Sequence, residues 1–245
     1  MRVLGVIPAR YESSRFPGKP LAIIHGKPMI WWVYHQTLKS GDLHQVYVAT
    51  DDERIYDVCR KCSINVLMTS TECKNGTERV YEVSRMIEAD VYVNIQGDEP
   101  TINPFMVSQV LTAFHDKSVQ VATLKREIIS ADDINNPLFA HIVTDKDGNA
   151  MYFSRSPIPH NRDGKGKAKH YKHVSIYAYT KAFFDNYPNF LASDLEQTEM
   201  LEQLQFLYNG IKIRVVETQY ESYGVDLPEH IEIVEKIITM NEVQI

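Results

Sequence analysis

Short hydrophobic runs rich in β-branched residues recur in the first half of the chain, and each ends in polar or acidic residues. The runs are RVLGVIPA (2–9), QVYVATD (45–51) and DVYVNIQGD (90–98). This pattern is typical of buried strands. Helical patterns alternate with them at residues 28–40, 52–63 and 77–88. Such alternation predicts an α/β fold, with a Rossmann-like, mostly parallel sheet covered by helices on both faces.

The carboxyl ends of these strands carry most of the polar side chains of this half. The first strand runs into a loop at Arg10, the second ends at ATDDE and the third at QGDEP. Because ligands of open parallel sheets bind at the carboxyl ends of the strands, we expect the three loops to line one cleft.

The pattern changes after residue 117 to one typical of antiparallel pairing. VQVATLKREI (119–128) and KHVSIYAYT (172–180) look like strands, and residues 140–159 look like a hairpin around an Asp-Gly-Asn turn. A helix is predicted across 195–210 and closed by Gly210, followed by a strand at 212–218 and a terminal helix with Pro228 near its start. We therefore expect a single domain over 1–245, with a nucleotide-binding core at 1–117 and 210–245 and a smaller mixed α+β subdomain at 118–209.

Composition excludes several classes of protein. The 245 residues are 44% hydrophobic and 24% charged, and the net charge of -6 provides no broad basic face for nucleic acid. Since no apolar run approaches the ~20 residues that span a bilayer, we expect no membrane insertion. The N-terminal apolar stretch is too short for a secretory signal, so a cytoplasmic location is expected.

The three cysteines do not form a disulfide framework, which favours a reducing compartment. Cys59 and Cys62 form a CxxC pair that could indicate redox or zinc chemistry. The pair falls inside a helical pattern rather than at a helix N-terminus, and only Cys73 could add a third sulfur. The pattern therefore favours an ordinary helix.

The loop PARYESSRFPGKPL (8–21) carries three cations, Arg10, Arg15 and Lys19, together with two hydroxyls and a Pro-Gly turn. It matches neither the P-loop nor the GxGxxG fingerprint, which disfavours a NAD-dependent oxidoreductase. Cationic donors and turn amides are suited to phosphate oxygens, so the loop predicts an anion site. A solvated loop with scattered charges is the alternative.

Two carboxylates complete this picture. Asp98 follows a glycine at the end of a buried strand, where it could bind Mg²⁺, a cation that prefers one or two carboxylates plus substrate phosphates. Asp226 in GVDLPE supplies a second carboxylate, although it could also cap the helix that follows. With the cationic loop, the pair predicts metal-assisted chemistry on a polyphosphate.

Seven segments together resemble one known family. They are IPARYESSRFPGKPL, NGTER, NIQGDEP, YFSRSPIP, KHVSIYAY, LEQTEMLEQL and GVDLPE. Their order and spacing are similar to those of the 3-deoxy-manno-octulosonate (Kdo) cytidylyltransferases, or CMP-Kdo synthetases, almost from end to end. The resemblance implies a fold of the nucleotide-diphospho-sugar transferase type. It also implies a Mg²⁺-dependent transfer from CTP to a 3-deoxy-2-ulosonic acid, a homodimer built through the second half, and a role in bacterial surface polysaccharide synthesis.

The resemblance also implies roles for individual residues. Arg10, Lys19, Asp98 and Asp226 would be catalytic, with the two aspartates holding the metal. The nucleotide would be bound by Pro8, Ala9, Arg10, Ser13, Ser14, Arg15, Lys19, Thr77, Arg79 and Gln96. The sugar would be bound by Gln96, Arg155, Arg162, His173, Tyr177, Glu202 and Gln203.

Each sugar-side residue also has a plainer interpretation. His173 could be a satisfied structural histidine, and Glu202 and Gln203 could be ordinary polar residues on a helix surface. The lysine-rich stretch between Arg162 and His173 could be a solvated loop, or a cationic lid over anionic substrates.

Five positions depart from the usual family pattern: Ser175, Ala178, His141, Gln205 and Leu227. They leave the nucleotide half intact and leave the identity of the sugar open. An 8-amino-3,8-dideoxy ulosonate, another sugar acid or a sugar 1-phosphate are alternative substrates. A catalytically silent nucleotide-binding protein is the alternative from another class.

Overall fold

The computed structural model describes residues 1–13, 15–136 and 138–240. Its contacts divide the chain into two compact units. Unit 1 holds residues 1–108 and the segment from Tyr220 onward, and unit 2 holds residues 109–219.

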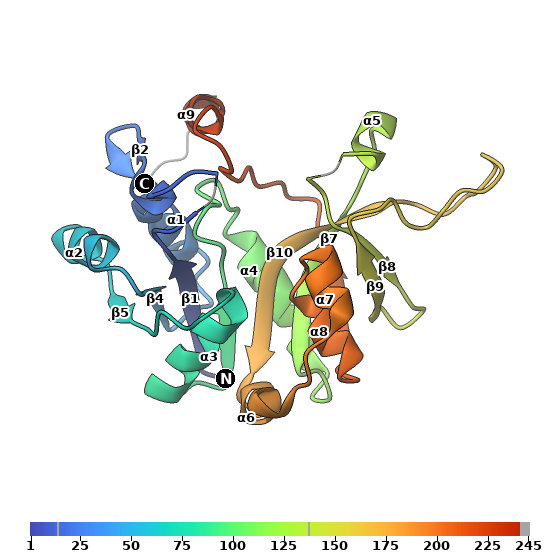
Figure 1. Ribbon diagram of the computed structural model, residues 1–245, viewed down its shortest axis with the longest axis horizontal. Helices are drawn as coiled ribbons and strands as arrows, with labels where there is room; N and C mark the ends of the chain where they lie inside the picture. Colours follow the sequence, from blue (N-terminus) through green and yellow to red (C-terminus); the bar gives the residue numbers. More distant parts are fainter. Residues whose placement is uncertain (14, 137, 241–245) are drawn as a thin grey trace. The chain divides into compact units, whose positions relative to one another are not determined.

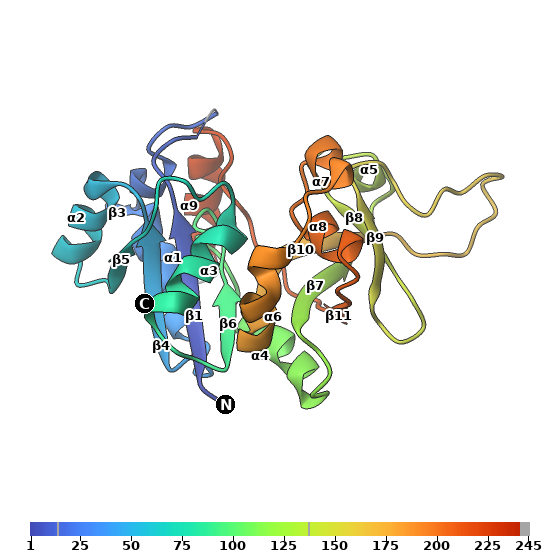
Figure 2. The same cartoon turned by 60° about the horizontal axis from the view of Figure 1, so that its bottom comes forward.

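The strands of unit 1 pair in parallel throughout, in the order β6-β1-β4-β5 (Figure 1). The strands are β1 (Val3–Ala9), β4 (Gln45–Thr50), β5 (Val66–Met68) and β6 (Val91–Asn94). The connecting helices are α1 (Met29–Leu38), α2 (Glu53–Lys61) and α3 (Gly76–Met86). Connections between parallel strands are right-handed. The connections through α1 and α2 run in one direction along the strand order and the connection through α3 runs back, so α1 and α2 cover one face of the strands and α3 covers the other. In Figure 2, α3 lies in front of the strands. The predicted parallel α/β core is confirmed.

The C-terminal segment is fixed to this core by apolar packing. A short hairpin, β2 (Ile23–Ile24) with β3 (Lys27–Pro28), follows the 3-10 turn η1 (Lys19–Leu21), and the last described element is α9 (His230–Met240). The hairpin, α1 and α9 share a buried cluster made of Ile24, Met29, Trp32, Val225, Val234 and Ile238. Val225 is fully buried in it. The next residue, Asp226, is thereby held at a fixed place in unit 1.

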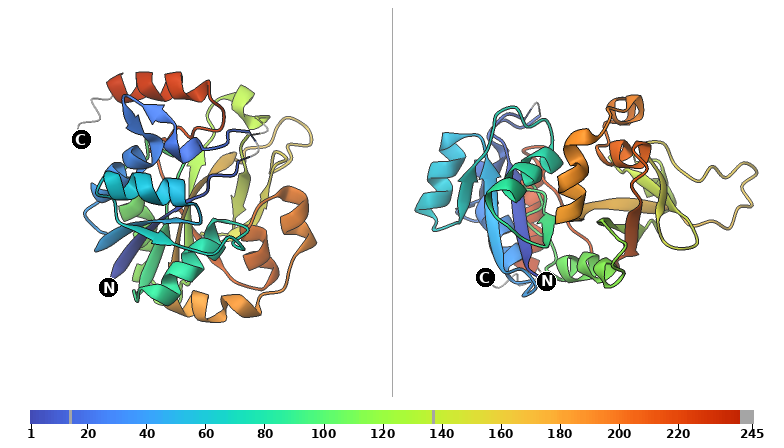
Figure 3. Two further views of the ribbon diagram at one scale, coloured as in Figure 1. Left: turned by 60° about the vertical axis from the view of Figure 1, so that its left-hand side comes forward. Right: turned by 90° about the horizontal axis from the view of Figure 1, so that it is seen from below.

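The strands of unit 2, drawn in green to orange in Figure 3, pair with one another in both parallel and antiparallel directions. They are β7 (Val121–Glu127), β8 (His141–Thr144), β9 (Ala150–Ser154), β10 (Tyr171–Thr180) and β11 (Ile213–Glu217). β11 pairs with β7 in parallel, and the β7, β10, β8 and β9 pairings are antiparallel. The helical segments are η2 (Thr112–His115), α5 (Ala131–Ile134), α6 (Lys181–Asn186), η3 (Tyr187–Asn189), α7 (Asp194–Glu199) and α8 (Gln203–Tyr208), with α4 (Phe105–Leu111) at the boundary.

The predicted hairpin is present. Asp145 closes the turn between β8 and β9, because its Oδ1 accepts hydrogen bonds from the backbone N–H groups of Asp147 and Asn149 at 2.9 and 2.8 Å. The expected single helix over 195–210 is wrong, however. It is two helices separated by Met200, which has a left-handed backbone with φ 53°. The break leaves Met200 exposed and buries Leu201 and Leu204.

The boundaries between the two units also differ from those expected at 117/118 and 209/210. The sequence pattern places the strand over 212–218 in the nucleotide-binding core. In the structure β11 pairs along its length with β7, so this segment belongs to unit 2. The hydrophobic pattern of a strand does not reveal which neighbouring strand it pairs with.

Candidate active site

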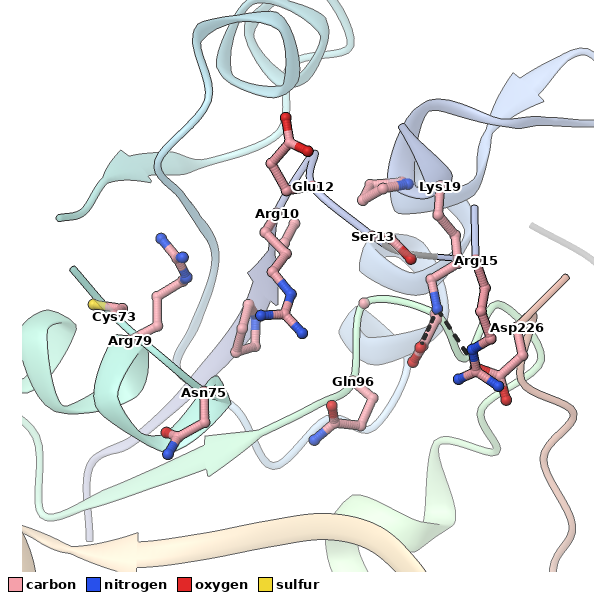
Figure 4. A pocket seen from close by; sticks show the side chains of 16 residues that line it. Arg10, Glu12, Ser13, Arg15, Lys19, Cys73, Asn75, Arg79, Gln96 and Asp226 are labelled. Carbon is pink, nitrogen blue, oxygen red and sulfur yellow. Dashed lines mark hydrogen bonds and ion pairs between the residues drawn. The ribbon is translucent and has the colours of Figure 1, made fainter. Parts of the chain in front are cut away.

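Unit 1 contains a cavity of about 580 Å³ at the carboxyl ends of its strands (Figure 4). It is lined by ten of the residues expected from sequence: Pro8, Ala9, Arg10, Ser13, Arg15, Lys19, Arg79, Gln96, Asp98 and Asp226. Residues far apart in the chain therefore meet in one place. Ser14 lies outside the described residues.

One end of the cavity holds Arg15, Lys19 and the paired carboxylates, and Arg10 lies between this end and Arg79 (Figure 4). Lys19 Nζ lies 2.6 Å from Asp98 Oδ2 and 3.9 Å from Asp226 Oδ1, and Arg15 Nη2 lies 2.8 Å from Asp226 Oδ1. A backbone hydrogen bond of 2.8 Å from Val225 N–H to the Asp98 carbonyl brings the two acidic segments together. Cationic and anionic side chains therefore alternate at this end of the cavity.

Asp226 does not cap α9. That helix begins four residues later, at His230, and the Asp226 carboxylate is engaged by Arg15 and Lys19 instead. Within the described part of the chain, no three His, Cys, Asp or Glu side chains form a metal-binding group. One or two carboxylates nevertheless suffice for Mg²⁺ when substrate phosphates and water supply its other ligands. Asp98 and Asp226 thus fit that cation.

The loop that carries the cations is held by local packing. Gly18 adopts a left-handed backbone with φ 71°, and its N–H donates to the Tyr11 carbonyl at 2.8 Å. The Arg54 guanidinium lies 3.3 Å from the centre of the Tyr11 ring and is itself bonded to Asp52. Glycine accepts positive φ without steric cost, which explains its place before Lys19.

A second glycine permits close approach of two strand ends. A Cβ added to Gly97 would lie 2.6 Å from the backbone carbonyl oxygen of Pro8. Only a residue without a side chain can therefore stand between Gln96 and Asp98 while β1 and β6 keep their separation. The sequence showed Gly97 as part of a turn, but not this contact.

The opposite end of the cavity is formed by the start of α3 and the segment before it. Cys73, Asn75, Gly76 and Arg79 line it. Arg79 is 3% exposed, with Nη2 2.8 Å from Asp51 Oδ2 and Nη1 2.5 Å from Thr69 Oγ1, so its buried charge is paired. Thr77 is fully buried and is not among the lining residues.

Six lining residues were not named from sequence: Glu12, Pro20, Cys73, Asn75, Gly76 and Gly97. Asn75 carried a usable signal, since asparagine three residues before Glu78 is an N-cap pattern. Its Oδ1 does accept the Glu78 N–H at 2.8 Å. The cavity-lining role of the others depends on tertiary packing.

In unit 2 the structure brings two of the expected sugar contacts together. The His173 and Tyr177 rings lie 5.2 Å apart between centroids, and His173 Nε2 is 2.9 Å from Thr123 Oγ1. Burial, then Glu202 and Tyr179, raises the pKa of Tyr177. The neighbouring Glu202 is half-buried, at the start of α8.

The remaining sugar-side residues lie apart in different settings. Arg155 donates to Leu138 O at 3.2 Å through its side chain and to Glu199 through its backbone, and Arg162 lies in the exposed loop before β10. Gln203 is 2% exposed and its Nε2 has no partner among the described residues, so it is not a helix-surface residue. A buried unpaired amide suits a ligand contact.

The five departures from the family pattern all fall in described residues. His141 is fully buried, neither ring nitrogen has a partner in the described part of the chain, and burial, then His170, lowers its pKa. Ser175 is exposed within the register shift of β10, and Ala178 is fully buried. Gln205 and Leu227 are partly exposed.

His173 makes stability depend on pH. Burial, then Arg155, lowers its pKa from 6.5 to about 3. The unfolded chain therefore binds a proton that the folded chain does not between these pH values, and stability falls as pH falls through this range. We expect the melting temperature of His173→Asn to fall less than that of the native protein between pH 7 and pH 4. The control is His115→Asn, at an exposed position. An equal fall of melting temperature with pH in all three proteins would contradict the assignment.

The CxxC pair is structural. Cys59 is buried in α2 and Cys62 follows the helix at its C-terminal end. Burial, then Cys62, raises the pKa of Cys59 to about 12. A protonated thiol is a poor nucleophile and metal ligand, so the expectation of an ordinary helix is confirmed.

Cations and paired carboxylates at the carboxyl ends of a parallel sheet are the arrangement expected of a nucleotidyltransferase. A family model described as "Cytidylyltransferase" matches residues 4–213. The chain is therefore a cytidylyltransferase by class. No helix in the described part of the chain has the length and apolar character needed to cross a membrane.

Individual relatives narrow the class. The 3-deoxy-manno-octulosonate cytidylyltransferase of Geobacter metallireducens is 45% identical over 97% of this chain and 98% of its own. That of Fusobacterium nucleatum is 44% identical over the whole of both chains. A solved CMP:2-keto-3-deoxy-manno-octonic acid synthetase complexed with CTP superposes with a TM-score of 0.93 at 42% identity, covering 98% of this chain and all of that one. The chain belongs to the 3-deoxy-manno-octulosonate cytidylyltransferase family.

Proposed function

We propose that the protein transfers the cytidylyl group of CTP to the anomeric hydroxyl of Kdo or a close analogue. The hydroxyl oxygen forms a bond to the α-phosphorus, the bond from that phosphorus to the β-bridging oxygen breaks, and the hydroxyl proton passes to solvent. The products are the CMP-sugar and pyrophosphate. The observation that carries this proposal is the single cavity that joins Arg10, Arg15 and Lys19 to Asp98 and Asp226.

The cations of the loop would act on the leaving group. Arg10 and Lys19 donate to the β- and γ-phosphates and offset the charge that develops as pyrophosphate departs. Ser13 and the Gly18 turn let the backbone approach the same oxygens. Arg15, which reaches Asp226 at 2.8 Å, orients that carboxylate.

Asp98 and Asp226 would hold Mg²⁺, which when bound neutralises phosphate charge and polarises the α-phosphate. The protein's own contribution is to hold the two carboxylates 2.6 and 3.9 Å from Lys19 Nζ. Because Lys19 pairs with both carboxylates, it would compensate their charge until substrate binds. Gln96, which lines the cavity next to Gly97, would contact the nucleotide and the sugar.

Residues of unit 2 would bind the sugar acid. Arg155, Arg162 and His173 are suited to its carboxylate, and Tyr177, Glu202 and Gln203 to its hydroxyls. The cationic stretch between Arg162 and His173 forms a long exposed loop (Figure 3). It would close over the anionic substrates as a lid.

We also propose a homodimer built through unit 2, where Ile129, Leu191 and Met200 are 87%, 66% and 78% exposed. Analytical ultracentrifugation would test this oligomeric state.

A pyrophosphate-release assay tests the proposed function and ranks the substrates. Kdo, its 8-amino analogue and N-acetylneuraminate are each supplied with CTP or UTP and Mg²⁺. We expect pyrophosphate release with CTP and one 3-deoxy-ulosonate. The CMP-sugar formed would supply bacterial surface polysaccharide synthesis. Binding of CTP without release across the panel would instead identify a catalytically silent nucleotide-binding protein.

A further inference from the structure

Asp226 is held in the cavity through its backbone as well as through its carboxylate. The carboxylate is engaged by Arg15 and Lys19. The backbone N–H donates to Nδ1 of His230, the first residue of α9, at 3.2 Å. What this second contact does for Mg²⁺ binding rests on the proposed function, in which Asp226 is a ligand of the metal.

Two consecutive peptide groups are fixed at this point of the chain. The Val225 N–H donates to the Asp98 carbonyl at 2.8 Å, and the next N–H, that of Asp226, donates to His230. The Val225 side chain is fully buried in the cluster to which α9 contributes Val234. Because both peptide groups that flank Val225 are bonded, the backbone of Asp226 is kept beside that of Asp98.

The residues between Asp226 and His230 supply little else that could hold this turn. Leu227 has no polar side-chain atom, Pro228 has no N–H, and Glu229 is exposed. The turn is closed from His230 instead, because its own N–H donates to the Leu227 carbonyl at 3.0 Å. His230 therefore both donates to and accepts from the segment that carries Asp226.

The bond to Asp226 also defines the state of the imidazole. A ring nitrogen accepts a hydrogen bond only when it carries no hydrogen, so Nδ1 is bare and Nε2 carries the hydrogen of the neutral ring. We propose that His230 is a positioning residue that holds the Asp226 backbone through Nδ1 and so keeps the two acids together for Mg²⁺. His230 is not among the residues that line the cavity, so it acts through Asp226.

Two substitutions at this position separate the hydrogen bond from the bulk of the side chain. In His230→Asn, Oδ1 of asparagine takes the place of Nδ1, since both atoms are bonded to Cγ, and the acceptor is kept. In His230→Leu the side-chain volume is similar but the acceptor is lost, which leaves the Asp226 N–H without its partner.

His44 provides a matched control in the same unit. Its Nδ1 also accepts a backbone N–H, that of Val3, at the same distance of 3.2 Å. This bond lies at the start of β1, and neither residue lines the cavity. His44→Leu therefore removes an equivalent hydrogen bond without changing the segment that carries Asp226.

The measurement is the affinity of Mg²⁺ for the full chain bound to CTP, by calorimetry without sugar, with Mg²⁺ binding to free CTP measured separately. For His230→Leu we expect this affinity to fall by about 10-fold or more, because a displaced ligand weakens the site. His230→Asn should stay within about threefold of the native affinity. His44→Leu should keep the native affinity, although its melting temperature should fall as much as that of His230→Leu.

Three results would overturn this role of His230. Native Mg²⁺ affinity in His230→Leu would show that Asp226 keeps its place without the bond. An equal loss in His230→Asn would show that the acceptor is not what matters. An equal loss in His44→Leu would show that the effect comes from general destabilisation.

The variant Asp98→Ala distinguishes a failure of this role from a failure of the proposed function. If Mg²⁺ affinity falls in Asp98→Ala but not in His230→Leu, the metal site stands and the role of His230 is refuted. If Asp98→Ala binds Mg²⁺ as tightly as the native protein does, the proposed metal site is refuted and the role of His230 with it.

Discussion

Replacing Asp98 with alanine is expected to abolish turnover while the fold remains intact. Asp98 is partly exposed at the end of the cavity, where its carboxylate pairs with Lys19 at 2.6 Å and lies beside the segment that carries Asp226. Loss of this carboxylate removes one of the two proposed Mg²⁺ ligands and leaves Lys19 without its nearest partner. We expect kcat/KM for pyrophosphate release to fall by at least about a thousand-fold.

The control for Asp98→Ala is another exposed aspartate paired with a lysine. Asp185 forms an ion pair with Lys181 one helical turn away in α6, outside the cavity. Asp185→Ala should retain native turnover, and both variants should melt close to the native temperature because exposed ion pairs stabilise little. Native activity in Asp98→Ala would refute the metal assignment.

Replacing Gly97 with alanine is expected to damage both stability and nucleotide binding. The new Cβ would stand 2.6 Å from the Pro8 carbonyl oxygen, and a backbone oxygen cannot turn away as a flexible side chain can. The ends of β1 and β6 must therefore move apart. We expect the free energy of unfolding to fall by about 1–3 kcal/mol, and CTP affinity to fall because Gln96 and Asp98 flank the displaced residue.

Gly41→Ala is the matched control for this change. Gly41 has φ 74° and nothing lies within 4 Å of an added Cβ, so alanine there meets only backbone strain. The cost of that strain is roughly 1–2 kcal/mol, and CTP affinity should remain native. Urea unfolding and calorimetry measure both quantities. Native CTP affinity in Gly97→Ala would show that the close approach of the strand ends does not position the site.

The parallel core could be predicted because strand ends and polar side chains coincide in the sequence. Strands β1 and β6 are buried runs that end in loops lining the cavity. The loop after β4, also expected there, does not line it, although Asp51 at its start pairs with the lining residue Arg79. β5 was missed, since its three residues are too few to show a period. The break at Met200 was also missed, because exposed Met200 and buried Leu201 look alike as hydrophobic letters.

The site could be predicted only where the type of a residue and its place in the sequence pattern indicate its role without knowledge of its tertiary contacts. Cations after a strand and acids after a glycine indicated Arg10, Lys19 and Asp98 directly. Asn75 required knowledge of the cap that orients its amide. The requirement for glycine at position 97 could not be predicted, because it depends on the carbonyl of Pro8, 89 residues earlier in the chain.

The most direct test of the central claim follows the phosphorus atoms of CTP. Phosphorus-31 NMR of the native protein with CTP, Mg²⁺ and Kdo should show loss of all three CTP signals. In their place should appear a CMP phosphodiester and pyrophosphate in equal amounts, and only when sugar and metal are both present. Release of inorganic phosphate, or breakdown of CTP without sugar, would contradict nucleotidyl transfer at this cavity.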